Sequence, residues 1–94
     1  MIVVREYFIA KPGCASKLAA MIKDVMSGTD YAVRIMTDLI GDFNQVVMET
    51  TLPDLAAFEA RLKQYGADPA IREKMKGYTD LWTSGRREVF RLVG

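Results

Sequence analysis

The order in which two hydrophobic periodicities follow one another is the feature that most constrains the fold of this chain. Residues 2–10 are rich in β-branched and aromatic types, which favour a strand, and the Pro-Gly pair ending at Gly13 stops that strand. Residues 14–26 carry apolar side chains three and four positions apart, as one face of a helix does, and Gly28 ends the helix. The start of the chain therefore predicts a strand followed by a helix.

The middle of the chain predicts a hairpin and the start of a second helix. Residues 31–39 and 45–51 have the composition of strands, and Gly41 with the Asp after it supplies a turn between them. The next helix is predicted to begin at Thr51, which can cap it. A Pro then fits the first turn, and Asp54 lies near the positive end of the helix dipole.

The last part of the chain predicts two helical segments and a final strand. The first segment carries the apolar stripe Leu55, Phe58, Leu62 and Tyr65. The second segment restarts at residues 68–69 and carries Ile71, Met75 and Tyr78, with Trp82 one turn further. We expect Gly66 and Gly85 to end the two segments, and residues 87–93 to alternate as the last strand.

The complete order is βαββαβ, taken as one domain over residues 1–94. This order predicts an α+β, ferredoxin-like fold, in which a four-stranded antiparallel sheet has its helices on one face. A chain of this length buries roughly 60–65% of the surface that its unfolded form exposes, so its core is thin. Association with a second chain would add to that core.

The alternation of side chains along each strand also assigns the two faces of the sheet. The set expected to pack under the helices, with Glu6 as its polar exception, is Val4, Phe8, Val33, Ile35, Val46, Met48, Phe90 and Leu92. The other set is Val3, Arg5, Tyr7, Ile9, Arg34, Met36, Val47, Glu49, Val89 and Arg91. That second face is too apolar for water alone, so two chains are predicted to pack these faces together as a homodimer around a partly polar cavity.

The chain resembles the dimeric α+β barrel superfamily, and within it NIPSNAP-like proteins and antibiotic-biosynthesis-type monooxygenases. The resemblance rests on residues 5–7 (Arg-Glu-Tyr), the turn at 11–13 (Lys-Pro-Gly), the long hairpin and the last strand at 87–93, and it covers nearly the whole chain. It implies a dimer with a cavity in each protomer, without implying one chemistry. Cofactor-independent monooxygenases of this superfamily rely on Trp, Tyr, Asn and Arg side chains, but their motif does not align with this sequence position by position, so no role is carried over from it.

The candidate ligand site is the charged part of the predicted cavity face. Arg5, Arg34 and Arg91 share this face with Glu49 and Tyr7. Guanidinium groups bind carboxylates or enolates in bidentate fashion, and an arginine beside a phenol can stabilise an oxyanion. The alternative is an ion-pair network in which arginines and glutamates satisfy one another across strands. Unpaired arginines in an open cavity would favour binding, whereas arginines paired with glutamates would favour the network.

Two further side chains are candidates outside that charged cluster. Trp82 could form the wall of a ligand pocket, although aromatic residues at helical spacing are usually part of a core. Cys14 lies near a helix start with lysines close in sequence, an arrangement that can activate a thiol. The chain has no histidine to act as a base for it, so packing beside Leu18 is the favoured interpretation.

The composition argues against several classes of function. The formal net charge is +1, without the basic excess of a nucleic-acid-binding protein. The chain has no apolar run long enough for a transmembrane helix and no signal-peptide pattern at its start, so we expect a soluble cytoplasmic protein without membrane contact. The lack of histidine and the single cysteine argue against a metal site or histidine-ligated haem, and no glycine-rich nucleotide motif occurs. We therefore expect no cofactor.

Two hypotheses for the function remain open at this point. The first is a small-molecule-binding protein or a cofactor-independent enzyme of the monooxygenase or isomerase type, acting on a small anionic or enolisable apolar compound. The second is a non-catalytic dimeric binding or structural module, in which the same charges only pair with one another. The sequence assigns no catalytic residue under either hypothesis.

Overall fold

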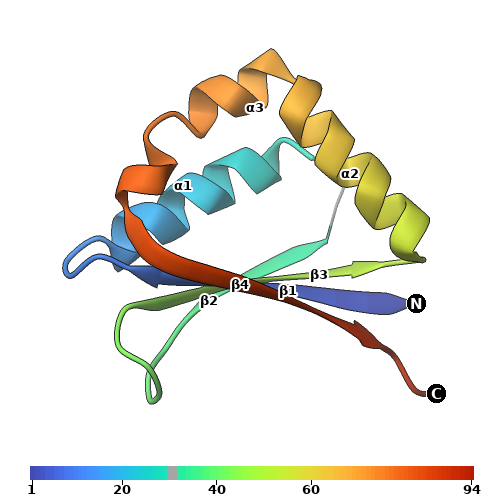
Figure 1. The fold of residues 1–94 in the computed structure, drawn as a ribbon, viewed down its shortest axis with the longest axis horizontal. Helices are drawn as coiled ribbons and strands as arrows, with labels where there is room; N and C mark the ends of the chain where they lie inside the picture. The colour runs from blue at the N-terminus through green and yellow to red at the C-terminus, as the bar shows by residue number, and fades with distance from the viewer. Residues whose placement is uncertain (30–31) are drawn as a thin grey trace.

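The computed structural model describes residues 1–29 and 32–94 of the chain. Its elements are β1 (Ile2–Ala10), α1 (Ala15–Ser27), β2 (Val33–Thr37), β3 (Gln45–Leu52), α2 (Leu55–Ala67), α3 (Pro69–Lys74), a 3-10 turn η1 (Tyr78–Asp80) and β4 (Trp82–Arg91). This is the predicted βαββαβ order, with α3 and η1 inserted before the last strand (Figure 1). Tyr31, the predicted start of the second strand, lies outside the described residues.

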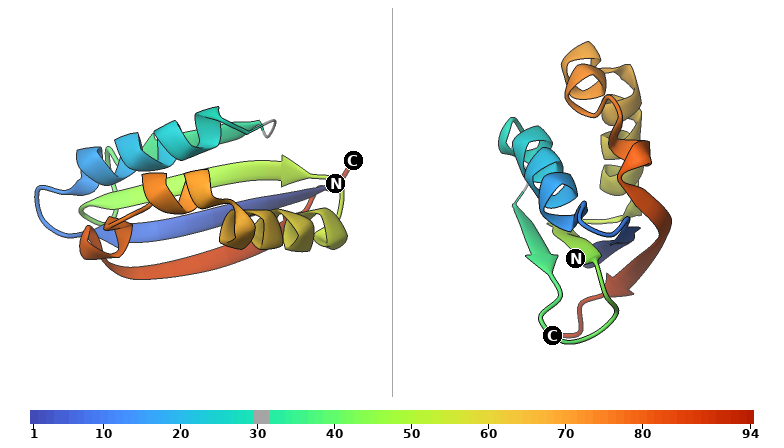
Figure 2. Two further views of the ribbon diagram at one scale, coloured as in Figure 1. Left: turned by 90° about the horizontal axis from the view of Figure 1, so that it is seen from above. Right: turned by 90° about the vertical axis from the view of Figure 1, so that its left-hand side faces the viewer.

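The four strands form one antiparallel sheet in the order β2-β3-β1-β4. The three helices cover one face of this sheet, and among residues 1–29 and 32–94 no helix or strand covers the opposite face (Figure 2). The α+β, ferredoxin-like fold predicted from the sequence is thereby confirmed. Directly paired residues on neighbouring strands share a face, so the register of the sheet decides which side chains meet the helices.

Two groups of buried side chains join the sheet to the helices. The larger group consists of Ala10, Leu18, Ile22, Val25, Met26, Val46, Met48 and Leu81. The smaller group consists of Val4, Leu52 and Phe58. The predicted apolar stripe of α1 is therefore confirmed, because its side chains supply half of the larger group.

The last strand begins five residues earlier than the sequence predicts. β4 starts at Trp82, and Gly85 lies inside it rather than ending a helix. A Cβ atom at position 85 would lie 3.2 Å from the carbonyl oxygen of Tyr7 and would contact the rings of Trp82 and Phe8. The lack of a side chain at Gly85 therefore allows close packing at this point of the strand. The polar residues around it interrupt the alternation of apolar side chains that would predict a strand.

The second helix also differs from its prediction in three respects. Thr51 belongs to β3, and the cap is Asp54, whose carboxylate accepts a hydrogen bond of 2.9 Å from the backbone N–H of Ala57. The helix continues through Gly66, and its buried side chains are Phe58 and Arg61. Leu62 is 37% exposed, because an arginine occupies the place under the helix that the apolar stripe assigned to leucine.

The faces of β4 are the reverse of those predicted. Val4 pairs with Val89, so Val89 faces the helices, whereas Phe90 pairs with Val3 on the open face. Arg91 follows Val89 onto the helix side, because it pairs with Ile2. The sequence could not decide which side chains of β4 face the helices, since apolar residues occur at both odd and even positions from 89 to 93. Glu6 lies under the helices as predicted, beside Met48 of β3.

Candidate functional site

The six residues predicted for the site divide between the two faces of the sheet. Those on the open face are Arg5, Tyr7, Arg34 and Glu49, which come from β1, β2 and β3. Arg91 and Trp82 lie on the helix side, at opposite ends of β4. The structure therefore brings together four of the predicted residues and separates the other two from them.

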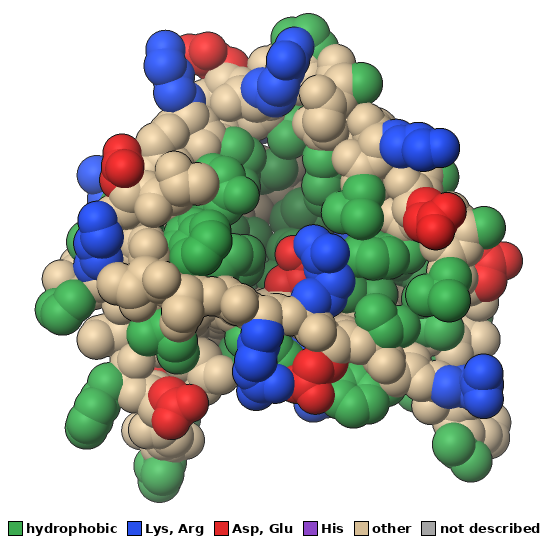
Figure 3. All heavy atoms as spheres, in the orientation of Figure 1, with side chains coloured by type: hydrophobic (Ala, Val, Ile, Leu, Met, Phe, Trp, Pro, Cys, Tyr) green, Lys and Arg blue, Asp and Glu red, His purple; other side chains and the backbone are tan. Residues whose placement is uncertain are grey.

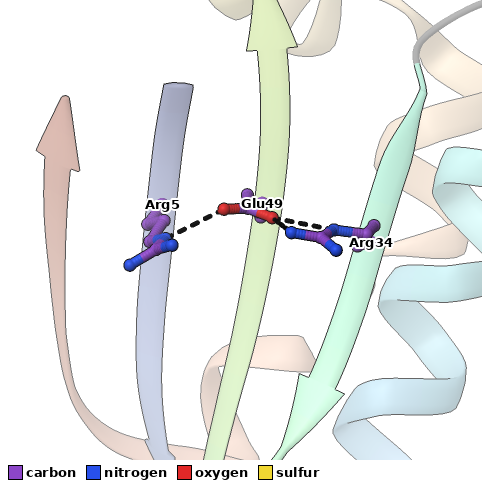
Figure 4. Close-up of polar contacts among 3 residues, drawn as sticks. All are labelled: Arg5, Arg34 and Glu49. Atoms are coloured by element: carbon purple, nitrogen blue, oxygen red, sulfur yellow. Dashed lines mark hydrogen bonds and ion pairs between the residues drawn. The ribbon is translucent and has the colours of Figure 1, made fainter. Parts of the chain in front are cut away.

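Three of the open-face residues form a compact ion-pair triad (Figure 4). Glu49 Oε1 accepts a hydrogen bond of 3.0 Å from Arg5 Nε. Its Oε2 accepts one of 2.8 Å from Arg34 Nε and a second bond from Arg34 Nη2. The side chain of Glu49 is 8% exposed, so both arginines bind a carboxylate that is largely withdrawn from water.

The charges of the triad reinforce one another. The hydrogen bonds from Arg34 and then from Arg5 hold the pKa of Glu49 below its usual range, against the opposing effect of burial. The hydrogen bond to Glu49 raises the pKa of Arg5, with a smaller contribution from the Tyr7 phenol. At neutral pH the triad therefore carries two positive charges and one negative charge.

The pairing favours the ion-pair interpretation of these residues over an open anion site. Each of the two arginines directs its Nε at the same carboxylate, and Arg5 also lies 5.6 Å from the centre of the Phe90 ring. Tyr7 also contacts a charged residue outside the triad: the Arg86 guanidinium lies 3.9 Å from the centre of its ring. The open face thus presents a paired triad, which together with Val3, Phe90 and Leu92 lines an open hollow of about 670 Å³.

Trp82 and Cys14 are packed against the core. The ring of Trp82 makes an edge contact with Phe8, at 5.5 Å between ring centres, and lies 6.1 Å from the ring of Tyr78. Cys14 is half-buried at the start of α1 and contacts the larger core group, as the packing interpretation expects. Neither side chain is part of the triad.

The structure contains a second candidate site that the sequence did not predict. A cavity of about 330 Å³ lies between the sheet and the arch of helices, and Figure 3 shows it as a hollow near the centre of that view. Its lining is mainly apolar and consists of Glu6, Phe8, Ile22, Val25, Met26, Met48, Leu62, Tyr65, Gly66, Ile71, Arg72, Met75, Tyr78 and Arg87. A mostly apolar hollow with a few polar groups is the usual form of a small-molecule site.

Glu6 and Arg87 form the polar end of this cavity, and Arg61, which does not line the cavity, holds Glu6 as well. Glu6 Oε1 accepts a hydrogen bond of 3.2 Å from Nη2 of Arg61, whose side chain is completely buried. Glu6 Oε2 accepts a longer one, 3.5 Å, from Nη2 of Arg87, whose side chain is 44% exposed. The centre of the Phe58 ring lies 5.3 Å from the guanidinium carbon of Arg61 and 5.1 Å from that of Arg87. The three polar side chains are therefore fixed by packing as well as by charge.

One signal in the sequence could have revealed this polar cluster. Phe58, Arg61 and Tyr65 are spaced by three and four residues, so an arginine stands in the stripe that faces the sheet. Glu6 stands out in the same way on the inward face of β1. A charged residue on each of two facing apolar surfaces predicts a buried ion pair.

The cavity has a further ordered polar contact in its wall. The hydroxyl of Tyr65 donates to the sulfur of Met26 at 3.1 Å, which joins α2 to α1.

Within the described part of the chain, no group of three His, Cys, Asp or Glu side chains is placed to hold a metal ion. In the same residues, no helix is long and apolar enough to cross a membrane.

Comparison with known proteins identifies the fold. No protein-family model matches the sequence, and no curated protein is significantly similar to it. A NIPSNAP-like domain protein from Burkholderia xenovorans superimposes with a TM-score of 0.86 at 19% identity, over 98% of this chain and 84% of that one. The chain has the NIPSNAP-like fold.

Structures associated with oxygenases share this fold as well. A candidate antibiotic biosynthesis monooxygenase from Chloroflexus aurantiacus superimposes with a TM-score of 0.77 at 14% identity, over 99% of this chain and 93% of that one. SnoaB, a cofactor-independent oxygenase from Streptomyces nogalater, gives 0.71 at 14% identity over the same shares. The resemblance to the dimeric α+β barrel superfamily is thus confirmed for the fold.

Proposed function

We propose that this protein binds a small, mostly apolar molecule with an anionic group in the cavity between sheet and helices. The observation that carries this proposal is the polar end of that cavity, where Glu6 is outnumbered by Arg61 and Arg87. Arg72 adds another positive charge to the cavity lining. An apolar lining that carries two guanidinium groups, Arg72 and Arg87, and one carboxylate, Glu6, fits a compound that has a hydrocarbon body and a carboxylate or enolate.

Arg87 is the residue best suited to bind the anionic group of such a ligand. Its contact with Glu6 is 3.5 Å, longer than that of Arg61, and nearly half of its side chain is exposed. A guanidinium has five N–H donors, so this contact leaves donors that can turn toward a ligand. Arg61, which is fully buried, would then hold Glu6 in place.

The chemistry that this arrangement supports is proton abstraction without a cofactor. The Glu6 carboxylate would take a proton from a carbon beside a carbonyl group, and the oxygen of the resulting enolate would accept hydrogen bonds from Arg87. Return of the proton at another carbon completes an isomerisation. Addition of dioxygen, as co-substrate, to the enolate carbon would form a carbon-bound hydroperoxide, and loss of water from it would leave one oxygen atom as a new carbonyl group, so that the substrate itself supplies the electrons. SnoaB is a cofactor-independent oxygenase of the same fold.

The second candidate function is a non-catalytic dimeric module. The pairing of both Arg5 and Arg34 with Glu49 favours it for the open face of the sheet. In our proposal that face forms a homodimer and the ligand binds on the helix side. Tyr7 and Glu49 then belong to the dimer surface, whereas Trp82 and Arg91 lie outside both.

A thermal-shift screen with matched ligands and variants tests the proposed binding site. Phenylacetate and octanoate are compared with their neutral amides, because a ligand bound only by the folded state raises Tm with its concentration. We expect the two carboxylates to raise Tm more than their amides do. Arg87→Gln should abolish this difference, and Arg86→Gln, its neighbour on the opposite face, should retain it.

The outcomes of this screen separate the two candidate functions. Equal rises in Tm for the carboxylates and their amides would contradict a site for an anionic group, although they would agree with an apolar binding cavity. A shift that is lost in Arg86→Gln and kept in Arg87→Gln would move the site to the open face. No shift with any compound would contradict the binding proposal and favour the non-catalytic module.

A further inference from the structure

Arg72 stands in the face of α3 that borders the cavity between the sheet and the helices. The lining residues from α3 and the turn after it are Ile71, Arg72, Met75 and Tyr78. These positions follow one another at the spacing of side chains on one face of a helix. Among the described residues of this segment, the other charged side chains, Glu73, Lys74 and Lys76, lie outside the lining. An arginine therefore occupies a place in a stripe that is otherwise apolar or aromatic.

The guanidinium of Arg72 differs from that of Arg87 in having no counter-charge. Arg87 binds Glu6, and the neighbouring Lys74 lies 3.9 Å from the carboxylate of Asp24 on α1. Among residues 1–29 and 32–94, Arg72 forms no ion pair. Its side chain is exposed, so it lies at the rim of the cavity with its N–H donors available to a bound molecule.

The two polar parts of the lining come from opposite sides of the cavity. Glu6 and Arg87 belong to β1 and β4 of the sheet, whereas Arg72 belongs to α3. Figure 1 shows α3 at the crown of the helical arch, across from β4. Most of the remaining lining is apolar, and Figure 3 shows hydrophobic side chains over the walls of the hollow. The cavity thus has one polar group at the sheet, another at the rim and apolar walls.

The volume of the cavity limits the length of a ligand that reaches both polar parts. A molecule of liquid water takes up about 30 Å³, so the cavity of about 330 Å³ holds roughly eleven groups of that size. A chain of about eight carbons with a polar group at each end has roughly this number of heavy atoms. Such a compound can contact the sheet and α3 at once.

We infer that Arg72 selects ligands with a second anionic group, so that the substrate class is an aliphatic oxo acid or dicarboxylate with a polar group at each end. One end, an enolisable carbonyl or a carboxylate, binds beside Glu6 and Arg87. The carboxylate at the other end binds the guanidinium of Arg72. This inference rests on the binding site proposed above and adds the second contact. The alternative is that Arg72 only covers apolar surface with its alkyl stem and keeps its charge in water.

Isothermal titration calorimetry with octanedioate and its monoamide tests the second contact. The two probes have the same length and nearly the same shape, but the monoamide has one negative charge fewer. We expect octanedioate to bind the wild-type protein about fivefold to tenfold tighter, because it forms one more charge-assisted pair and has two equivalent ends. Rising ionic strength should reduce this preference, because salt screens a pair at an exposed rim.

Arg72→Gln and Lys76→Gln are the matched variants for this titration. Each removes one positive charge from an exposed position, and Lys76 lies outside the cavity lining. Arg72→Gln should reduce the preference to the statistical factor for two equivalent ends, whereas Lys76→Gln should retain it in full. Arg72→Gln should leave the affinity for octanoate unchanged, since the proposed site binds that carboxylate at Arg87. Arg72→Lys should retain part of the preference, because it keeps the charge without the bidentate geometry.

The outcomes separate this inference from the site on which it rests. If octanedioate and its monoamide differ only by the statistical factor while octanoate binds tighter than octanamide, the role of Arg72 is wrong and the proposed site stands. A preference that Arg72→Gln retains in full would also overturn the inference, because another cation would then bind the second carboxylate. If no compound binds, the proposed site itself is contradicted, and the inference fails with it.

Discussion

The buried pair of Arg61 and Glu6 gives the sharpest test of how the polar end of the cavity is held. Arg61 has no exposed side-chain surface, and its Nη2 lies 3.2 Å from a carboxylate whose side chain is 15% exposed. Glu6→Ala leaves this guanidinium in the core without that counter-charge. Breaking a buried pair from one side costs about 3–5 kcal/mol, against about 5–15 kcal/mol for the stability of a whole domain.

Unfolding in urea, followed by circular dichroism, measures this loss. We expect Glu6→Ala to lower the free energy of unfolding by at least about 3 kcal/mol, which corresponds to a fall in Tm of about 12 °C or more. The double variant Glu6→Leu with Arg61→Met should lose much less than the two single changes together, because apolar side chains can replace a buried pair. A loss below about 1 kcal/mol in Glu6→Ala, or additive losses in the cycle, would refute the buried pair as described.

Three further changes test the local packing and electrostatics. Gly85→Val should destabilise the chain by about 1–3 kcal/mol, because its Cβ meets the Tyr7 carbonyl at 3.2 Å; an unchanged urea midpoint would contradict this close approach. Asp54→Ala removes the α2 cap and should cost about 0.5–2 kcal/mol by the same assay, whereas no loss would mean that the cap hydrogen bond is not formed in solution. The third concerns pH: folding lowers the pKa of Glu49, so its contribution is fully present above the unfolded value of about 4.3 and is lost as the pH falls through the lower folded value. The stability difference between wild type and Glu49→Gln should therefore be constant above about pH 5 and shrink below it, and a difference that grows on acidification would contradict the triad.

The fold could be predicted where one periodicity dominates a segment. The nine residues of β1 and the stripe of α1 satisfy a single pattern, and the structure has them where the sequence predicts them. The phase of β4 could not be predicted, since apolar residues stand at both parities near Phe90. Its early start was hidden for another reason, because Gly85 is required by contacts with β1 that only the folded chain makes.

The candidate site was predictable only in part, for reasons of distance along the chain. Arg5, Arg34 and Glu49 were grouped correctly because strand alternation places them on one face. The cavity was missed because its polar end joins Glu6, Arg61 and Arg87, which come from β1, α2 and β4. These three residues meet because of the position at which α2 crosses the sheet. No pattern within one segment of the sequence predicts that position.

The methionine methyl groups offer the most direct test of ligand binding in the helix-side cavity. Met26, Met48 and Met75 line this cavity, whereas Met36 lies on the open face. In a chain labelled with ¹³C at the methionine methyls, titration with octanoate should shift the signals of the three cavity methionines and leave Met36 unchanged. A shift of Met36 with the other three unmoved would contradict the account and place the ligand on the open face.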